Sequence, residues 1–475
     1  MLFSSLEFLY GFLPAALILC FLLPARMKNG VLLALSLFFY AWGEPRYLLL
    51  MLAVILLNYT AGLLTERYFA RRRIARAVLI ASVTLNLLLL GFFKYADFVL
   101  SSLSRIPALS GIRPLGILLP IGISFYIFQA MSYVIDVYRG EVAAQRSLLR
   151  FALYVSLFPQ LVAGPIVRYR DVDLELSHRT VTPASVFGGM LTFVSGLMKK
   201  VFLANALGLL WENAYRTPAS EQTVLGAWLG IVAFMLQIYF DFSGYSDMAI
   251  GLGRILGFHF LENFAYPYTA ESVTDFWRRW HISLSAWFRE YVYIPLGGNR
   301  KGKGRTYRNL LIVWALTGLW HGASLNFLLW GLYYGLLLIF EKAFFCRFLD
   351  KMPRALCRGY TLLCALFGWL IFAFDGTIEM LSPSLGIGYA LRMLGVGAAG
   401  FLSALDLYEL SRNGILFALA VLACLPYPKR LFYRALKKKP TLMTVSAALA
   451  ATAALVLSTA YLADSSYNPF LYFRF

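Results

Sequence analysis

The sequence predicts an all-α polytopic membrane protein that folds as a helical bundle. Hydrophobic residues make up 60% of its 475 residues and charged residues only 14%, so most of the chain must lie in the membrane or in short loops. Apolar runs close to the ~20 residues that cross a bilayer recur from one end to the other. We expect roughly 10–12 membrane-embedded helices in one transmembrane domain, residues 1–462, followed by a tail, residues 463–475.

Apolar runs mark the expected helices in chain order. A break at Trp42-Gly43-Glu44-Pro45 divides the region between the first two basic loops into an out-and-back hairpin. The runs are Leu6–Leu23, Tyr47–Leu64, Ala77–Phe93, Leu115–Val134, Phe187–Leu203, Ala227–Phe240, Tyr360–Phe374, Ile415–Leu425 and Leu442–Leu462.

One further stretch, from Asn309 to Phe340, contains no Asp, Glu, Lys or Arg over 32 residues. At about 1.5 Å per residue it is too long for one perpendicular span. We therefore expect two converging segments, broken near Gly318 and Gly322, with His321 near the bilayer midplane.

The basic residues predict the topology. The net charge is +19, but the clusters Arg71–Arg73, Arg300–Arg305 and Lys437–Lys439 lie at the ends of apolar runs, which is typical of cytoplasmic loops. Such loops contact anionic lipid headgroups, and this distribution argues against nucleic-acid binding. Arg26 and Lys28 follow the first helix, so we expect the N-terminus outside. Lys437–Lys439 precede the last apolar run, so the tail is also expected outside.

His321 is the most isolated ionisable residue, in Thr317-Gly-Leu-Trp-His-Gly-Ala-Ser324. An ionisable side chain at membrane depth is costly unless it faces a cavity or a partner, so it is a candidate functional residue. The alternative is a neutral histidine that is hydrogen-bonded within the bundle.

A second histidine lies in an aromatic segment that begins at Asp275. Trp277, Trp280, Leu284, Trp287, Tyr291 and Ile294 recur at the spacing of one helical stripe, and Arg278 and Arg279 lie off it. A helix with an aromatic face and a basic face predicts a location at the membrane interface. His281 lies beside the stripe, either as a functional group or as an incidental part of an interfacial anchor.

Three further segments combine polar groups with glycine or proline. Gln237–Gly251 contains acids and hydroxyls directly after an apolar run, and Leu119–Gln129 and Phe158–Arg168 contain helix-breaking residues. Polar groups and freed backbone at membrane depth need a polar cavity or each other. These segments could line an internal tunnel, or they could be helix kinks without chemistry.

Together these residues resemble the signatures of the membrane-bound O-acyltransferase (MBOAT) family. The matching segments are Trp320-His321-Gly322-Ala323, Arg278-Arg279-Trp280-His281 with Ile294–Gly298, and Asp241-Phe-Ser-Gly-Tyr-Ser-Asp247. The likeness is to the bacterial branch of alginate O-acetylases, peptidoglycan O-acetyl-translocases and D-alanyl-lipoteichoic-acid transferases. It runs in order along essentially the whole chain.

The resemblance implies a bundle with a central tunnel that joins the two membrane faces, in a multi-pass protein of the bacterial plasma membrane. It makes His321 the essential catalytic histidine and His281, the second signature histidine, a further catalytic candidate. The residues that we expect at the substrate or in the tunnel are Asp241, Ser243, Tyr245, Ser246, Asp247, Gln129, Trp320, Arg278 and Arg279.

Acyl transfer from a thioester to a hydroxyl fits these residues, because histidine can remove the proton from the acceptor oxygen near neutral pH. The thiol is a good leaving group, so neither a metal nor a serine nucleophile is needed. Five cysteines are scattered without metal-ligand spacing and are interpreted as small buried side chains. We expect no bound cofactor, and a donor substrate that is acetyl-CoA or an acyl thioester on phosphopantetheine.

The chain ends in Asn468-Pro-Phe-Leu-Tyr-Phe-Arg-Phe475. One interpretation is an interfacial aromatic anchor. The other rests on resemblance to the Phe-x-Tyr-Phe-x-Phe ending of the small partner subunits of D-alanyl transferases, whose tyrosine is implicated as an acyl relay. On that interpretation Tyr472 carries the acyl group.

In D-alanyl transferases this ending usually lies on a separate subunit. Here it is part of the acyltransferase chain, which favours the polysaccharide O-acetylation branch. Acetyl would then pass to a separate extracytoplasmic transferase of the SGNH-hydrolase type, or directly to a glycan acceptor. The alternatives are D-alanylation of teichoic acid and, in a different class, a solute transporter or flippase without acyl chemistry. A transporter should show repeated halves, and the sequence has no obvious internal repeat.

Overall fold

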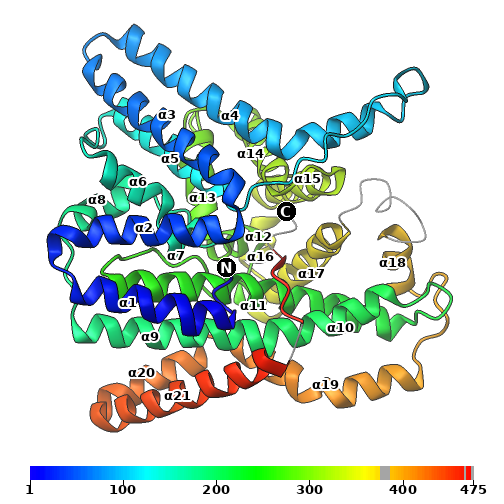
Figure 1. Ribbon diagram of the computed structural model, residues 1–475. Coiled ribbons are helices and arrows are strands. Elements are labelled where there is room, and N and C mark those ends of the chain that lie inside the picture. Colours follow the sequence, from blue (N-terminus) through cyan, green and yellow to red (C-terminus); the bar gives the residue numbers. More distant parts are fainter. Residues whose placement is uncertain (375–385, 465–466, 472–475) are drawn as a thin grey trace. The chain divides into compact units, whose positions relative to one another are not determined.

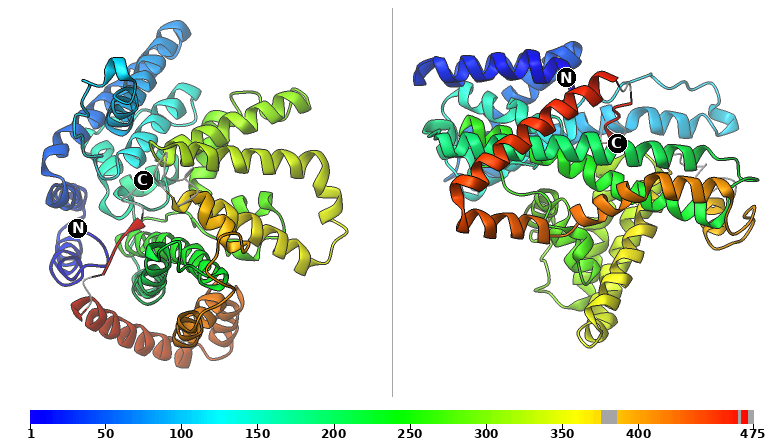
Figure 2. Two further views of the ribbon diagram at one scale, coloured as in Figure 1. Left: turned by 90° about the vertical axis from the view of Figure 1, so that its right-hand side faces the viewer. Right: turned by 90° about the horizontal axis from the view of Figure 1, so that it is seen from below.

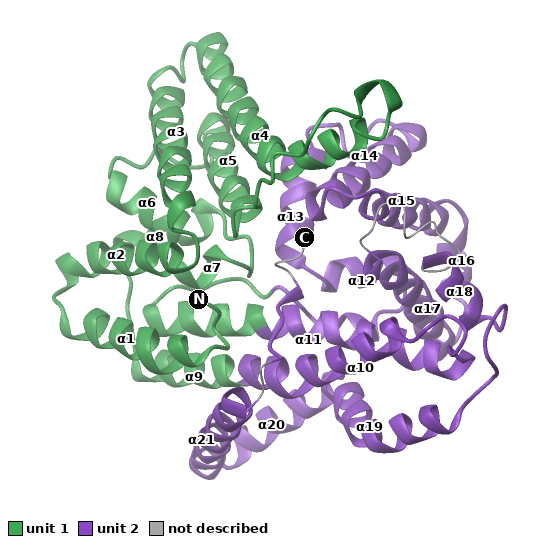
Figure 3. Cartoon of the chain, turned by 45° about the vertical axis from the view of Figure 1, so that its right-hand side comes forward, with its two compact units in different colours: residues 1–194, 245–262 green, residues 195–244, 263–475 purple. Residues whose placement is uncertain are grey.

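The computed structural model describes residues 1–374, 386–464 and 467–471, and every regular element in these ranges is a helix (Figure 1). The predicted all-α class is confirmed. The chain divides into two compact units (Figure 3). Unit 1 comprises Met1–Val194 and Tyr245–Glu262, and unit 2 comprises Ser195–Gly244 and Asn263–Phe475.

The helices of the first part of the chain build unit 1. They are α1 (Leu13–Leu22), α2 (Ala25–Gly43), α3 (Leu48–Arg67), α4 (Arg72–Leu103), α5 (Ile123–Arg139), α6 (Leu148–Ser156), α7 (Phe158–Leu161) and α8 (Tyr169–Ser177), with most of α9 (Pro183–Met198) and the last turns of α11 (Val224–Leu256).

The remaining helices belong to unit 2, together with the first part of α11. They are α10 (Asn205–Arg216), α12 (Val273–Arg279), α13 (Ile282–Phe288), α14 (Lys303–His321), α15 (Leu325–Phe340), α16 (Cys346–Leu349), α17 (Arg354–Ala373), α18 (Gly386–Met393), α19 (Ala404–Ala423), α20 (Tyr427–Lys438) and α21 (Pro440–Asp464). Short 3₁₀ and π turns are η1 (Glu7–Phe12), η2 (Pro45–Tyr47), η3 (Pro107–Leu109), η4 (Lys199–Ala204), η5 (Pro267–Thr269), η6 (Arg289–Tyr293) and η7 (Glu341–Phe345).

Polar side chains join apolar helices within unit 1. Asn58 on α3 and Asn86 on α4 are fully buried and exchange amide hydrogen bonds of 3.0 and 2.9 Å, and Ser82 donates a third bond to Asn58. Hydrogen bonds of this kind hold helices together where lipid offers the backbone and side chains no alternative partner.

Close helix packing organises unit 2, where α14 and α15 lie side by side (Figures 1 and 2). A Cβ on Gly331 of α15 would lie 2.2 Å from the carbonyl oxygen of Trp314 on α14. A Cβ on Gly318 of α14 would lie 2.3 Å from the carbonyl oxygen of Phe327 on α15. Only glycine permits this approach, which brings the two backbones into contact.

Seven helical stretches in the described residues are long and apolar enough to cross a membrane, or up to eight if α19 and α20, bent by 63°, form one broken span. The seven are Pro45–Arg67, Arg72–Leu103, Pro183–Arg216, Val224–Leu256, Leu325–Leu349, Arg354–Ala373 and Pro440–Asp464. One shorter apolar helix in these ranges, Glu7–Leu22, is not among them, so the described spans are fewer than the expected 10–12.

Three details differ from the sequence-based expectations. The helix expected within Leu115–Val134 begins only at Ile123, because Pro120 precedes Gly122, which has a φ of 73° and caps the helix. The helix expected over Ala227–Phe240 does not end there but continues as α11 through the polar segment Gln237–Gly251. The aromatic helix is interrupted at His281, whose φ of 44° ends α12 and starts α13. The predicted break near Gly322 is confirmed, and Gly318 lies inside α14.

Candidate active site

His321 is the last residue of α14 and is 8% exposed. Its ring is surrounded by aromatic rings, with centroid distances of 5.0 Å to Trp320, 5.0 Å to Trp330 and 5.3 Å to Phe372. The C-terminal end of a helix carries partial negative charge. The His321 ring therefore lies between the negative end of α14 and a set of aromatic side chains.

The turn after His321 is narrow because of glycine. Gly322 has extended backbone, and a Cβ on it would lie 2.3 Å from the ring of Phe327. With the Gly318 and Gly331 contacts, this turn brings α15 directly back along α14. The position of His321 is thus set by the backbones of two helices.

His321 lines a cavity of about 20 Å³ within unit 2. This volume accommodates about one water molecule. The lining residues come from α11, α14, α15, α17, the end of α12 and the C-terminal tail: Ile238, Asp241, Phe242, Trp280, His321, Trp330, Trp369, Phe372 and Leu471.

His281 lies between α12 and α13 and is 2% exposed. Its Nδ1 is 3.1 Å from the amide oxygen of Asn263, so Nδ1–H donates to that oxygen and Nε2 carries the lone pair. Ser283 also donates to this oxygen, at 2.9 Å. Burial lowers the pKa of His281 to about 3, so the ring is neutral at physiological pH.

Trp320 contacts both histidines. Its ring centroid lies 5.9 Å from that of His281 and 5.0 Å from that of His321. Phe242 packs against His281 at 4.7 Å and also lines the His321 cavity. The two signature histidines therefore belong to one packed cluster with Trp320 and Phe242, and Asp241 lines the same cavity as His321.

Asp241 forms a buried ion pair with Lys200, with Nζ 2.7 Å from Oδ1. Its other oxygen, Oδ2, accepts a 2.8 Å hydrogen bond from the backbone N–H of Leu471 in the tail. Lys200 Nζ donates to the carbonyl oxygen of Pro469. Phe470 and Leu471 are 5% and 7% exposed, so this part of the tail is docked inside unit 2.

The proposed relay residue itself, Tyr472, lies outside the described residues, as do Phe473 and Phe475. The role assigned to it from the sequence stays a prediction. The described part of the tail ends one residue before it, at Leu471 in the His321 cavity.

The other residues predicted at the tunnel fall into two groups. Ser243 is 2% exposed in unit 2, one residue from Phe242. Tyr245, Ser246 and Asp247 belong to unit 1, where the Tyr245 ring stacks on Phe3 at 4.5 Å. Gln129 is fully buried on α5, also in unit 1. The central tunnel stays a prediction.

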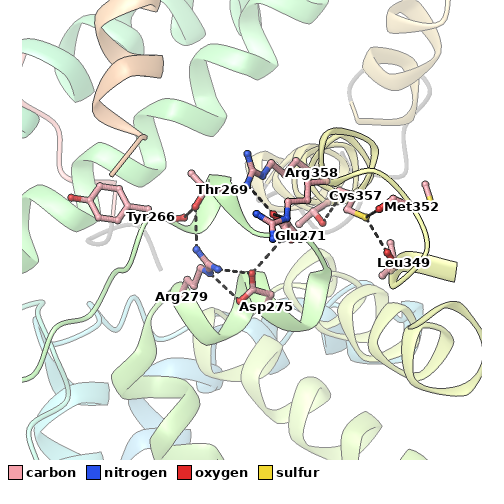
Figure 4. A network of polar contacts seen from close by, with 11 residues as sticks. Tyr266, Thr269, Glu271, Asp275, Arg279, Leu349, Met352, Cys357 and Arg358 are labelled. Carbon is pink, nitrogen blue, oxygen red and sulfur yellow. Dashed lines mark hydrogen bonds and ion pairs between the residues drawn. The ribbon is translucent and has the colours of Figure 1, made fainter. Parts of the chain in front are cut away.

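Neither arginine of the signature lines the cavity. Arg278 is exposed, whereas Arg279 forms an ion pair of 2.8 Å with Asp275 and donates to Thr269 (Figure 4). The same network includes the 2.8 Å ion pair of Glu271 with Arg358 of α17. It ties the segment before α12 to α17, so Arg279 supports the site from outside the cavity.

Sequence reasoning missed Lys200, Asn263 and Leu471. Lys200 carried a usable signal, because a lysine within the apolar run Phe187–Leu203 is as unexpected as an intramembrane histidine. Asn263 and Leu471 carried none, since their contacts join segments that are distant in sequence. No group of three or more His, Cys, Asp or Glu in the described ranges could hold a metal ion.

Comparisons with known proteins decide the family. The model of the membrane-bound O-acyltransferase family matches residues 141–382, which contain both histidines. A probable alginate O-acetylase of Pseudomonas putida is 41% identical, with the whole of both chains covered. The chain belongs to the membrane-bound O-acyltransferase family.

Two further relatives of this acyltransferase act on cell-wall polymers according to their names. A peptidoglycan O-acetyltransferase of Helicobacter pylori is 32% identical over all of this chain and 98% of the relative. A teichoic acid D-alanyltransferase of Bacillus subtilis is 30% identical over 47% of this chain and 60% of the relative.

Family membership confirms the resemblance found in the sequence. The chain is a multi-pass membrane protein and an O-acyltransferase. It is not a solute transporter without acyl chemistry.

Proposed function

We propose that this acyltransferase moves an acetyl group from a cytoplasmic thioester donor across the plasma membrane, for O-acetylation of an extracellular or cell-wall polysaccharide. The observation that carries the proposal is that His321 and the docked C-terminal tail line one cavity. Full-length similarity to alginate O-acetylases supports acetyl as the group transferred.

His321 acts as the general base. It removes the proton from an acceptor hydroxyl, whose oxygen attacks the thioester carbonyl carbon. The C–S bond then breaks, and the leaving thiolate takes the proton from the imidazolium. The products are an oxygen ester and a free thiol. The surrounding aromatic rings exclude bulk water, which would otherwise hydrolyse the thioester.

Tyr472 is the first acceptor in this proposal. Its phenol becomes an acetyl ester while the donor leaves as a thiol, and the ester is then attacked by a hydroxyl of the outer acceptor, which regenerates the phenol. Support comes from Leu471, which directly precedes it and lines the cavity with His321. This relay lets acetyl cross the membrane although the donor does not.

The donor is acetyl-CoA or a phosphopantetheine-carried thioester, and it meets a cytoplasmic surface that includes Arg300–Arg305. The N-terminus and the tail then lie on the extracytoplasmic side. There the acetyl group passes to an SGNH-type acetyltransferase or directly to the glycan. Phosphate groups of the donor favour a basic surface because the interaction is electrostatic.

His281 positions the site rather than reacting. Its ring is buried, hydrogen-bonded through Nδ1 to Asn263 and in contact with Trp320, which also touches His321. It holds the Trp320–His321 end of α14 against α11.

His321→Ala tests the function, with His178→Ala as the matched control because His178 is an exposed histidine outside the site. In cells that depend on this chain for polysaccharide acetylation, His321→Ala should lower base-released acetate by at least ~10²-fold, as for general acid–base groups. His178→Ala should leave it unchanged. Both proteins are quantified in isolated membranes.

Undiminished acetate from a correctly inserted His321→Ala protein would remove this histidine from the mechanism. The same hydrolysate reports the acyl group. Ester-linked D-alanine in place of acetate would support the alternative, D-alanylation of teichoic acid, which the partial similarity to a D-alanyltransferase keeps open.

A further inference from the structure

A buried ion pair in unit 2 joins two helices and the C-terminal tail. Lys200 lies in η4, a π-helical turn between α9 and α10, and Asp241 lies on α11. Their side chains are 2% and 3% exposed. Single π turns within helices occur frequently at functional sites, because the extra residue redirects a side chain.

Each member of the pair makes a second bond, and both bonds go to the main chain of the tail. Lys200 Nζ donates to the carbonyl oxygen of Pro469, and Asp241 Oδ2 accepts from the N–H of Leu471 at 2.8 Å. The two main-chain groups are two residues apart. Asn205, one turn after Lys200, adds a 3.3 Å bond to the Asn468 side chain.

Stability alone does not explain this arrangement. A buried ion pair contributes little net stability, because desolvation of the two charges offsets their attraction. Hydrogen bonds from charged groups to backbone, however, are strong and directional. Here they fix which residue of the tail lies at the cavity.

We propose that Lys200 and Asp241 form a receptor for the tail main chain that sets its register, so that Leu471 enters the His321 cavity and Tyr472 follows it. The inference rests on the proposed relay role of the tail. Both residues act as positioning residues. The receptor binds backbone, so it would hold any residue type in the tail except a proline at position 471, which lacks the N–H.

The test measures docking directly, through alkylation of a reporter cysteine, Leu471→Cys, in the purified full-length protein. A water-soluble maleimide is added, and the labelled C-terminal peptide is quantified by mass spectrometry. Lys200→Met/Asp241→Leu removes both charges together, so no single buried charge is left without its partner. Labelling should accelerate at least about tenfold, since charge-assisted hydrogen bonds are lost.

Lys199→Met, which removes the adjacent lysine, is the matched control and should leave labelling slow. Cys424, a buried native cysteine in unit 2, reports folding and should stay protected in every variant. Wild-type labelling rates in the doubly neutral variant, with Cys424 protected, would overturn the inference.

If Cys424 loses protection, Leu471→Pro takes over in the otherwise native chain. This substitution removes the N–H group that donates a hydrogen bond to Asp241, and it leaves the helices unchanged. A non-specific protease should then trim the tail at least about tenfold faster, judged by intact mass. An unchanged trimming rate overturns the inference.

Failure of the proposed function gives a different pattern. His321→Ala should abolish acetate transfer while the Leu471→Cys reporter stays slow to label. Retained transfer in His321→Ala would refute the function without affecting the docking result.

Discussion

Gly331→Ala tests whether the contact between α14 and α15 sets the position of His321. The added methyl group would lie 2.2 Å from the carbonyl oxygen of Trp314, and side-chain carbons essentially never approach closer than 3.0 Å. Both groups belong to helix backbones, so neither can rotate away. The helices must separate by about 0.8 Å, the difference between these two distances.

This displacement predicts a defined loss of activity. Trp314 and His321 lie two turns apart on the same helix, so a rigid shift of α14 moves His321 by a similar distance. A misplacement of about 1 Å at a reacting group costs about 10²-fold in rate. Overpacking of this size also costs about 1–3 kcal/mol of stability. We expect a 10- to 100-fold loss of acetyl transfer, with the protein still present in the membrane.

Two alanine substitutions provide graded controls. A Cβ on Gly335 would lie 3.3 Å from Leu311 and Trp314 side chains, which can adjust by a few tenths of an ångström. A Cβ on Gly304, at the start of α14, meets nothing within 4 Å. The amount of base-released acetate per membrane-inserted protein should be highest for Gly304→Ala, lower for Gly335→Ala and lowest for Gly331→Ala. Equal activity in all three variants would show that this helix contact does not position the base.

Three further predictions concern other parts of the site. Tyr472→Phe keeps the ring but deletes the acceptor oxygen, so acetylation should collapse, and intact-mass spectra of the native chain should show an acetyl ester that the variant lacks. Burial lowers the pKa of His281 from 6.5 to about 3, so the stability of the folded protein should fall as pH falls from about 6.5 towards 3. In His281→Gln, the thermal unfolding midpoint should depend less on pH over that range. Charge reversal in the basic loop should raise the KM for an acetyl-CoA probe. In the native protein, donor binding should weaken as the salt concentration rises, because salt screens the charges. Unchanged donor affinity in the variant would mean that the loop serves only the topology. The positions reversed are Arg300, Lys301, Lys303 and Arg305.

Hydropathy was sufficient to predict the helical class and the paired helices around His321. The charge-free stretch from Asn309 to Phe340 is too long for one span, and glycine at 322 marks the place where it turns. His321 was selected as a candidate because an ionisable residue in such a stretch is rare. Both inferences depend on local sequence alone, which is why they could be made.

The interruption at His281 could not be predicted from periodicity. Helical spacing continues across the interruption in Trp277, Trp280 and Leu284, and all three side chains are buried. The burial pattern is therefore that of one helix, although the backbone forms two. The left-handed backbone at His281 is accompanied by contacts with Asn263, which accepts from Ile282 N–H and from the histidine ring. That partner lies 18 residues earlier and has no sequence signal of its own.

The positive charge of a side chain likewise did not predict its structural role. Arg279 and Lys200 are both basic residues near the site, yet Arg279 pairs with Asp275 four residues away on the same helix, whereas Lys200 pairs with an aspartate on another helix. Only the first pairing has a recognisable spacing. The second depends on how η4 and the first part of α11 pack within unit 2, and its link to the tail spans 269 residues.

The size of the cavity constrains the order of events on the proposed route. With Leu471 in place, about 20 Å³ remains beside His321, which is room for one water molecule but not for an acetyl group. The other lining groups are large rings and helix residues held in packed positions, whereas Leu471 belongs to a terminal segment whose main chain is held by the Lys200–Asp241 pair. An acetyl group can therefore reach His321 most readily when the tail undocks from this pair and Leu471 leaves the cavity. Because the tail is part of the same chain, its return is an intramolecular step with a high effective concentration, and the acceptor hydroxyl need not be recruited from solution.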